Sequence, residues 1–280
     1  MPLSTGWPTC STSSTPGADG RPVVPELHEV LLLCLAAGFA GWVDAVSGGG
    51  GLVQLPALLI WLPGAAPATV LATNKLSSVC GTAASALTYQ RRVRPDLRTA
   101  LPMAAVALVG AAAGAACASL LPRSVFEPLV LVLLVVVAAW TVARPAMGLE
   151  ERLRFDGHRH HLVAAAAGGS IGFYDGIFGP GTGAFLVVAL VGLLGYAFLQ
   201  ASATARIVNL ATNVGALLVF IPQGAPLWGL GLAMGGCNVA GGWLGAHTAI
   251  RRGSGFVRVV FLTVVTALVL RLGYDVLTDS

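Results

Sequence analysis

Two basic residues, Lys75 and Arg206, lie deep within long apolar segments of the sequence. A charge at the centre of a membrane helix costs about 2.5–3.5 kcal/mol on insertion scales, so each cation needs a compensating partner or a polar cavity. In one arrangement Lys75 pairs with Asp44 and Arg206 with Asp175, which gives two internal ion pairs. In the other, both cations flank a site for an anion. The two arrangements can coexist if the acids hold the cations in place while the anion is absent.

Each cation belongs to a polar stripe on its segment. Hydroxyl and amide side chains recur beside it at helical spacing, and such a stripe must face protein or water rather than lipid. Amides and hydroxyls can donate hydrogen bonds to an oxyanion, although Asn and Ser stripes also serve to pack helices. The stripe residues are Thr73, Asn74, Ser78 and Thr82 around Lys75, and Thr204, Asn209 and Asn213 around Arg206.

Two glycine-rich breaks, Gly48–Gly51 and Gly179–Gly183, follow the two acids and precede short apolar stretches at about 52–63 and 183–195. The first N–H groups of a helix lack intrahelical partners, so a helix that begins after a glycine break is a ready anion site. A packing hinge is the alternative, because glycine is common in membrane helices. The residues predicted to approach an anion through these breaks are Gly50, Gly51, Gly181, Thr182 and Gly183.

The composition sets the class of protein that must position these residues. Apolar residues make up 56% of the 280-residue chain, charged residues 10%, and the mean hydropathy is +0.81. A soluble domain carries about 25% charged residues, so a soluble enzyme, a disordered chain and a nucleic-acid-binding protein are excluded. The sequence predicts an all-α polytopic membrane protein. Segments long enough to cross a bilayer run at about 27–46, 67–90, 98–120, 124–143, 161–178, 198–221, 227–249 and 256–275.

The second half of the chain repeats the first at a shift of 131 residues, which places Asp44 on Asp175 and Lys75 on Arg206. Cytoplasmic loops collect Lys and Arg, and the basic loops exchange sides between the halves, as an inverted repeat requires. Inversion needs an odd number of crossings in each half, so we expect about ten transmembrane segments in two inverted five-helix repeats. The arginine clusters lie at 91–98, 144–159 and 251–258.

The expected organisation is a disordered tail at 1–26, a first transmembrane repeat at 27–145, a basic cytoplasmic linker at 146–160 and a second repeat at 161–280. No pattern in the sequence indicates a cofactor, a metal site, an enzyme active site or a nucleic-acid partner. The expected partners are a small anionic substrate and membrane lipid. A homo-oligomer is left open.

A family resemblance rests on both halves. The stretch AGFAGWVDAVSGGGGL at 37–52, followed by ATNKL at 72–76, resembles the first-repeat signature of the TauE/SafE family of sulfite exporters. The second-repeat signature is similar to GFYDGIFGPGTG at 172–183 followed by ATARIVNL at 203–210, with Ala205 where Ser or Thr often stands. The resemblance covers about residues 28–277.

The resemblance implies a multi-pass transporter of the bacterial inner (plasma) membrane that exports sulfite, organosulfonates such as sulfoacetate, or related small sulfur-containing anions. Lys75 and Arg206 would neutralise the anion. The side chains that would bind it through hydrogen bonds are Thr73, Asn74, Ser78, Thr204, Asn209 and Asn213. Asp44 and Asp175 would brace the cations or carry a coupling proton. The alternatives are a passive small-anion channel and a transporter of a non-sulfur carboxylate anion.

Overall fold

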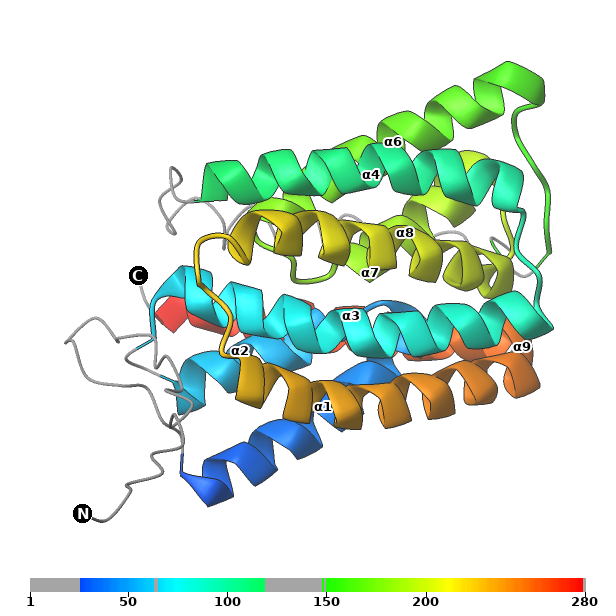
Figure 1. The fold of residues 1–280 in the computed structure, drawn as a ribbon. Helices are drawn as coiled ribbons and strands as arrows, with labels where there is room; N and C mark the ends of the chain where they lie inside the picture. Colours follow the sequence, from blue (N-terminus) through cyan, green and yellow to red (C-terminus); the bar gives the residue numbers. More distant parts are fainter. Residues whose placement is uncertain (1–25, 63–64, 119–147, 149, 279–280) are drawn as a thin grey trace, which may run out of the picture.

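A computed structural model of the chain describes residues 26–62, 65–118, 148 and 150–278, with side chains up to residue 267 except at position 265. Within these ranges the regular elements are helices (Figure 1). They are α1 (Leu27–Ser47), α2 (Gly51–Trp61), α3 (Pro67–Arg92), α4 (Leu97–Cys117), α6 (Gly157–Ile177), α7 (Thr182–Ala189), the π-helical η2 (Leu190–Leu194), α8 (Phe198–Phe220) and α9 (Trp228–Thr278).

The observed helices match the predicted segments closely. The segments at 227–249 and 256–275 form one long element, α9, which bends at the non-helical Gly253 (φ 74°, ψ −174°). The segment predicted at 124–143 lies outside the described residues. Among the described helices, α1, α4 and α8 are long and apolar enough to cross a membrane, while α2 and the α7–η2 stretch are shorter apolar helices.

Both glycine-rich breaks use a left-handed backbone conformation. Helix α1 ends at Gly48 (φ 88°), whose N–H donates a hydrogen bond to the carbonyl oxygen of Asp44. Helix α7 begins directly after Gly181 (φ 79°). Side chains disfavour this conformation, so glycine lets the chain stop one helix and begin the next within a few residues. The breaks therefore bring the two acids close to the start of the short helices.

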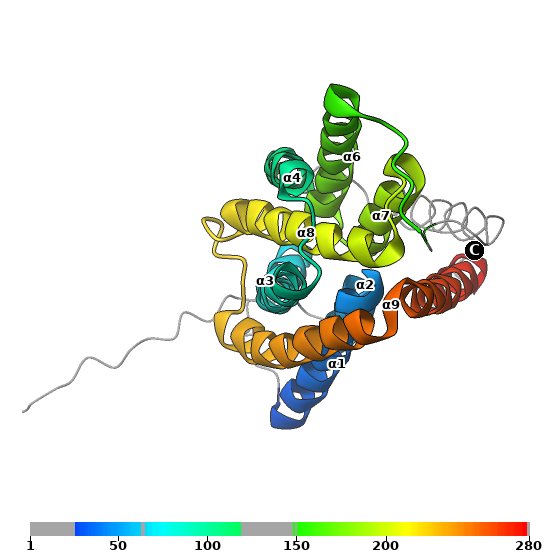
Figure 2. The ribbon, with the colours of Figure 1, turned by 90° about the vertical axis from the view of Figure 1, so that its right-hand side faces the viewer.

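The helices form two layers, seen end-on in Figure 2. One layer contains α1, α2, α3 and the first stretch of α9, and the other contains α4, α6, α7 and α8. Helix α1 packs against α9, whereas α6 packs against α4. Each layer thus includes a helix from the other half of the sequence, and the halves are interleaved in space. Helices α3 and α8 meet where the layers join.

Glycines allow close approach in both layers at equivalent positions. A Cβ on Gly41 of α1 would lie 2.5 Å from the carbonyl oxygen of Asn238 on α9, and one on Gly172 of α6 would overlap the carbonyl of Ala107 on α4. Gly172 follows Gly41 by 131 residues, and Asn238 follows Ala107 by the same number. The packing of the layers thus follows the repeat found in the sequence.

Equivalent helices run in opposite directions. In Figure 1, α3 runs from left to right and α8 from right to left, and α1 and α6 are related in the same way. Helix α3 ends, and α4 and α6 begin, at the right-hand end of the molecule. The arginines at 91–98 and 152–159 belong to these helix ends, so described basic segments that are far apart in sequence gather at one end.

Candidate functional site

Two buried ion pairs join the layers, and their partners are exchanged between the halves of the chain. The Nζ atom of Lys75 on α3 lies 2.6 Å from Oδ2 of Asp175 on α6. The Nη1 atom of Arg206 on α8 lies 2.6 Å from Oδ2 of Asp44 on α1. The Lys75 side chain is 3% exposed and the Arg206 side chain is 0% exposed.

The arrangement that pairs Lys75 with Asp44 and Arg206 with Asp175 is therefore wrong, and the arrangement in which both cations flank an anion site stays a prediction. In the sequence each cation follows the acid of its own half, which suggested that the two would pair. In the structure, α3 and α8, which carry the cations, pack against each other where the layers join. Each cation consequently points across this junction toward the first helix of the other half. Each ion pair therefore joins one layer to the other, and both ion pairs must break if the layers separate.

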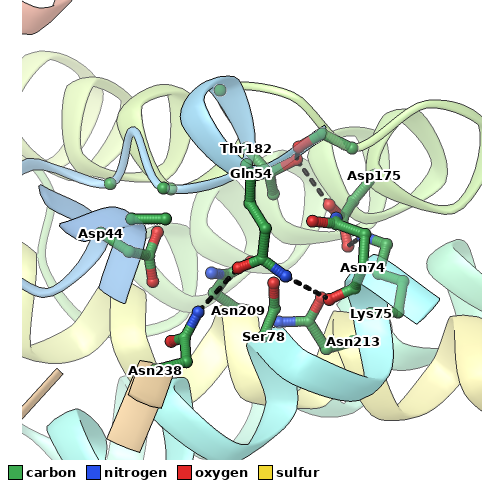
Figure 3. Close-up of a pocket in the computed structure, with 17 residues that line it drawn as sticks. Asp44, Gln54, Asn74, Lys75, Ser78, Asp175, Thr182, Asn209, Asn213 and Asn238 are labelled. Atoms are coloured by element: carbon green, nitrogen blue, oxygen red, sulfur yellow. Dashed lines mark hydrogen bonds and ion pairs between the residues drawn. The ribbon is translucent and has the colours of Figure 1, made fainter. Parts of the chain in front are cut away.

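Lys75, Asp175 and Asp44 line a small cavity (Figure 3). Its volume of about 20 Å³ is close to the space that one water molecule needs. The lining brings together most of the residues predicted from the sequence. They are Asp44, Gly50, Gly51, Asn74, Lys75, Ser78, Asp175, Gly181, Thr182, Gly183, Asn209 and Asn213.

Two lining amides, Gln54 of α2 and Asn238 of α9, were not predicted. Gln54 is fully buried and projects into the middle of the cavity (Figure 3). Its Oε1 accepts a hydrogen bond of 2.8 Å from Nδ2 of Asn238, and its Nε2 donates one of 3.4 Å to the carbonyl oxygen of Asn74. Both are single amides in otherwise apolar segments. Neither has a polar neighbour three or four residues away, so neither belongs to a polar stripe of the kind used to select candidate residues.

The hydrogen-bonded residues Gln54, Asn74 and Asn238 all belong to the same layer. The positions related to Gln54, Asn74 and Asn238 by the 131-residue shift are Phe185, Ala205 and Ala107. The opposite layer supplies Asn209 and Asn213 from α8 instead. The cavity is therefore chemically asymmetric even though the two carboxylates that line it are related by the repeat.

The two glycine breaks touch at the edge of the cavity. The backbone N–H of Ala184 donates a hydrogen bond of 3.1 Å to the carbonyl oxygen of Gly48, and a Cβ on Gly48 would overlap the backbone of Gly183. The Thr182 hydroxyl donates a hydrogen bond of 2.6 Å to Oδ1 of Asp175. The start of α7 thus holds the carboxylate that pairs with Lys75.

Three predicted residues do not line the cavity. Arg206 contacts two residues that line the cavity, Asp44 and Gly183, but does not line it itself. Its Nη2 atom would lie 2.6 Å from a Cβ on Gly183. The Thr73 hydroxyl accepts a hydrogen bond from the backbone N–H of Leu227, just before α9 begins. Thr204 is fully buried on α8.

Several buried polar atoms of the site lack hydrogen-bond partners within the described part of the chain. They include two of the three nitrogens of the Arg206 guanidinium, the Nδ2 donor of Asn213 and the hydroxyls of Thr82 and Thr204. Buried polar groups are normally hydrogen-bonded. An unusual concentration of unused donors around two cations is the electrostatic setting that an oxyanion requires.

The family model described as "Sulfite exporter TauE/SafE" matches residues 33–272 of the chain. The chain belongs to the TauE/SafE family. This is a family of membrane transporters, and the relatives described below are named as such. The resemblance found in the two signatures is confirmed.

Bacterial relatives match most of the chain. A protein of Sinorhizobium sp named "Probable membrane transporter protein ORF9" is 37% identical over 249 residues, covering 89% of this chain and 94% of its own length. "Probable membrane transporter protein YfcA" of Escherichia coli K12 is 32% identical over 245 residues, covering 87% and 89%. No solved structure matches the chain significantly.

Proposed function

We propose that the chain is a secondary transporter that carries sulfite, organosulfonates such as sulfoacetate, or related small sulfur-containing anions by alternating access. The observation that carries this proposal is the pair of buried cations, each bound to a carboxylate that lines one shared cavity. A sulfite or sulfonate group presents charged oxygen acceptors like those of a carboxylate. The aspartates therefore occupy positions that the oxygens of a transported anion would take.

The anion competes with the aspartates in this mechanism. A cavity of about 20 Å³ holds about one water molecule, so an oxyanion enters only when the surrounding side chains move apart. Lys75 and Arg206 then exchange a carboxylate for the anion, and the unused donors of Arg206 and Asn213 gain acceptors. Protonation of Asp44 or Asp175 at this step would release a cation and couple anion movement to a proton.

Relative movement of the two layers provides the access. Because both ion pairs and the Gly48–Gly183 contact cross the junction between layers, opening either side of the cavity breaks some of these contacts. Bound anion replaces the lost charge pairing, so it lowers the cost of the transition. Transporters built from inverted repeats commonly place substrate at broken helices near the bilayer midplane, and the glycine breaks here fit that arrangement.

The topology in this proposal is about ten crossings in two inverted five-helix repeats, spanning 27–145 and 161–280, in the bacterial inner membrane. The opposite directions of α3 and α8 and the gathering of basic helix ends support it, since Lys and Arg favour the cytoplasmic side. The bacterial origin of the relatives supports the location. Export is inferred from the description of the family model.

A non-sulfur carboxylate anion is the second candidate substrate, because carboxylates are the groups that both cations bind in the structure. The small volume of the cavity, about 20 Å³, favours a transporter over a passive channel, which needs a continuous path. We infer transport rather than catalysis, since the family is one of membrane transporters.

Flux in proteoliposomes tests the proposal. The panel contains sulfite, thiosulfate, sulfoacetate, taurine, sulfate and acetate, and the variants are Lys75→Ala and Arg206→Ala. Lys75→Arg and Arg206→Lys keep the charge and report on folding, and Arg98→Gln, an exposed arginine at the end of the molecule, is the matched control. We expect saturable, trans-stimulated uptake of one sulfur anion that both alanine variants abolish and Arg98→Gln preserves.

Unsaturable flux would indicate a channel, and selective acetate uptake would indicate a carboxylate transporter. Sulfur-anion uptake that persists in both folded alanine variants would contradict the proposed site.

A further inference from the structure

A second hollow lies outside the ion-pair cavity, on the outer side of the contact between α3 and α9. It consists of two adjoining cavities of about 620 and 380 Å³ that share Trp243 and His247. Both are far larger than the central cavity and open to the surface of the helix layer. The larger cavity lies between α3 and the first stretch of α9, which pack side by side (Figure 2), and the smaller one is lined by α9 alone.

The chemistry of this groove changes along its length. On α3 the lining runs from Leu87 to Arg91 and Arg92, and on α9 it runs from Val239 through Trp243 to Arg251 and Arg252. Both helices run toward the same end of the molecule in Figure 1. One end of the groove is therefore apolar and the other carries four arginines.

The groove has the length of one membrane leaflet. Val239 and Arg251 are twelve residues apart on α9, which corresponds to about 18 Å of helix at 1.5 Å per residue. Half of a hydrocarbon core of about 30 Å is about 15 Å. Arginines at one end and apolar side chains over the remaining length match the order of headgroup and acyl chain in a single leaflet.

The apolar and basic groups of the groove are both free to bind a ligand. Leu87 is 52% exposed and Trp243 is 50% exposed. The four arginines are exposed, and none of them forms an ion pair with a described acid. The Arg252 guanidinium lies 5.3 Å from the centroid of the Phe256 ring, and the Trp243 and His247 rings lie 4.4 Å apart. Trp243 and His247 thus lie between the two parts of the groove, and Phe256 contacts the arginine end.

We propose that this groove binds one anionic phospholipid of the leaflet at the basic end of the molecule. Its phosphate contacts Arg91, Arg92, Arg251 and Arg252, and an acyl chain lies along Leu87 and Val239. Basic pockets between membrane helices recognise anionic headgroups, and an amphipathic Trp favours this depth in the bilayer. Charge complementarity selects a lipid over a second copy of the chain, which would bring the same four arginines against one another.

Native mass spectrometry of the purified chain tests this directly. The protein in lipid-free detergent is titrated with dioleoyl phosphatidylglycerol, with dioleoyl phosphatidylcholine, and separately with inorganic phosphate or glycerol 3-phosphate. We expect phosphatidylglycerol to bind at one saturable site much more tightly than phosphatidylcholine. The free phosphates should bind weakly, because they use only the arginine end of the groove.

Substitutions locate the site. An arginine near a membrane surface contributes roughly a fivefold gain in affinity for anionic lipid, so Arg91→Gln/Arg92→Gln and Arg251→Gln/Arg252→Gln should each weaken binding by roughly 25-fold. Arg152→Gln/Arg154→Gln is the matched control, because it removes the same charge from exposed arginines outside the groove. This control should change the affinity less than about twofold, within ordinary surface effects.

Equal affinity for the two lipids in the wild-type protein would overturn the proposal without any variant. So would equal loss in the groove and control variants, or phosphate binding as tight as lipid binding. A dimer that masks the groove and excludes lipid would show that a second copy is the occupant. None of these readouts depends on anion transport, so the lipid site stands or falls independently of the proposed function.

Discussion

The exchanged ion pairs make a quantitative prediction about which side chains depend on each other. The Lys75 Nζ and Asp175 Oδ2 atoms are 2.6 Å apart, and at this separation two unit charges attract by about 6 kcal/mol for an effective dielectric constant of about 20. Desolvation offsets part of that attraction, and removing one partner of a buried pair typically costs about 3–5 kcal/mol. We expect Asp175→Asn to lower the free energy of unfolding by about 3 kcal/mol.

A double-mutant cycle isolates the contact from the other effects of each substitution. The free energy of unfolding is measured in detergent micelles for Lys75→Met, Asp175→Asn and the double variant, and we expect a coupling energy of about 2–3 kcal/mol. The matched cycle replaces Asp175→Asn by Asp44→Asn. Asp44 is the acid of Lys75's own half but contacts Arg206, so the second coupling energy should be smaller by about 2 kcal/mol.

A coupling between Lys75 and Asp44 that equals or exceeds the coupling with Asp175 would refute the exchange of partners. If the single variants do not fold, variants in which the lysine and an aspartate are exchanged test the same contact. The variant Lys75→Asp/Asp175→Lys restores an attractive pair and should recover folded protein, as judged by monodisperse elution in detergent. Lys75→Asp/Asp44→Lys places like charges in both contacts and should not recover it.

Three further predictions follow from the packing of the site. Gln54→Ala should enlarge the cavity and raise the ratio of sulfoacetate to sulfite uptake in proteoliposomes. It should also lower the unfolding free energy by about 1–3 kcal/mol, because the Asn238 donor loses its acceptor. An unchanged uptake ratio would contradict a role of Gln54 in size selection. Gly48→Ala should abolish folded protein, judged by elution in detergent, because the φ of this residue is 88° and its Cβ would overlap the backbone of Gly183. The control Gly236→Ala on α9 has open space around its Cβ, so its unfolding free energy should stay within about 1 kcal/mol of the wild-type value. Tyr89→Phe should lower the unfolding free energy by about 1 kcal/mol, since its hydroxyl donates a buried hydrogen bond of 2.9 Å to a carbonyl oxygen of α1; an unchanged stability would show that this bond contributes nothing.

Much of the candidate site could be predicted because the cost of polar groups in an apolar segment singles them out. Lys75, Ser78, Asn209 and Asn213 stand out against their apolar neighbours, and the repeat adds a second, independent reason to select them. The helices could be predicted for the same reason, since an apolar run bounded by glycine, proline or charge has few other structures in a membrane. Gln54 stood alone in its segment, so neither argument selected it.

The partners of the cations could not be predicted from the repeat. A shift of 131 residues relates Asp44 to Asp175 and Lys75 to Arg206, which establishes equivalence but says nothing about contact. Either pairing satisfies the repeat equally well. Only the packing of α1 on α9 and of α6 on α4 decides that each half supplies the acid for the other.

The sequence by itself therefore determined the class of protein, the positions of the described helices, the two glycine breaks and the identity of the buried charges, because each of these follows from local composition and from the high cost of polar groups in hydrocarbon. The tertiary structure alone decided the interleaving of the halves, the exchanged ion pairs and the entry of Gln54 and Asn238 into the cavity. These features depend on contacts between helices distant in sequence, where the close approach permitted by small residues such as Gly41 and Gly172 selects one packing among several that satisfy the same pattern.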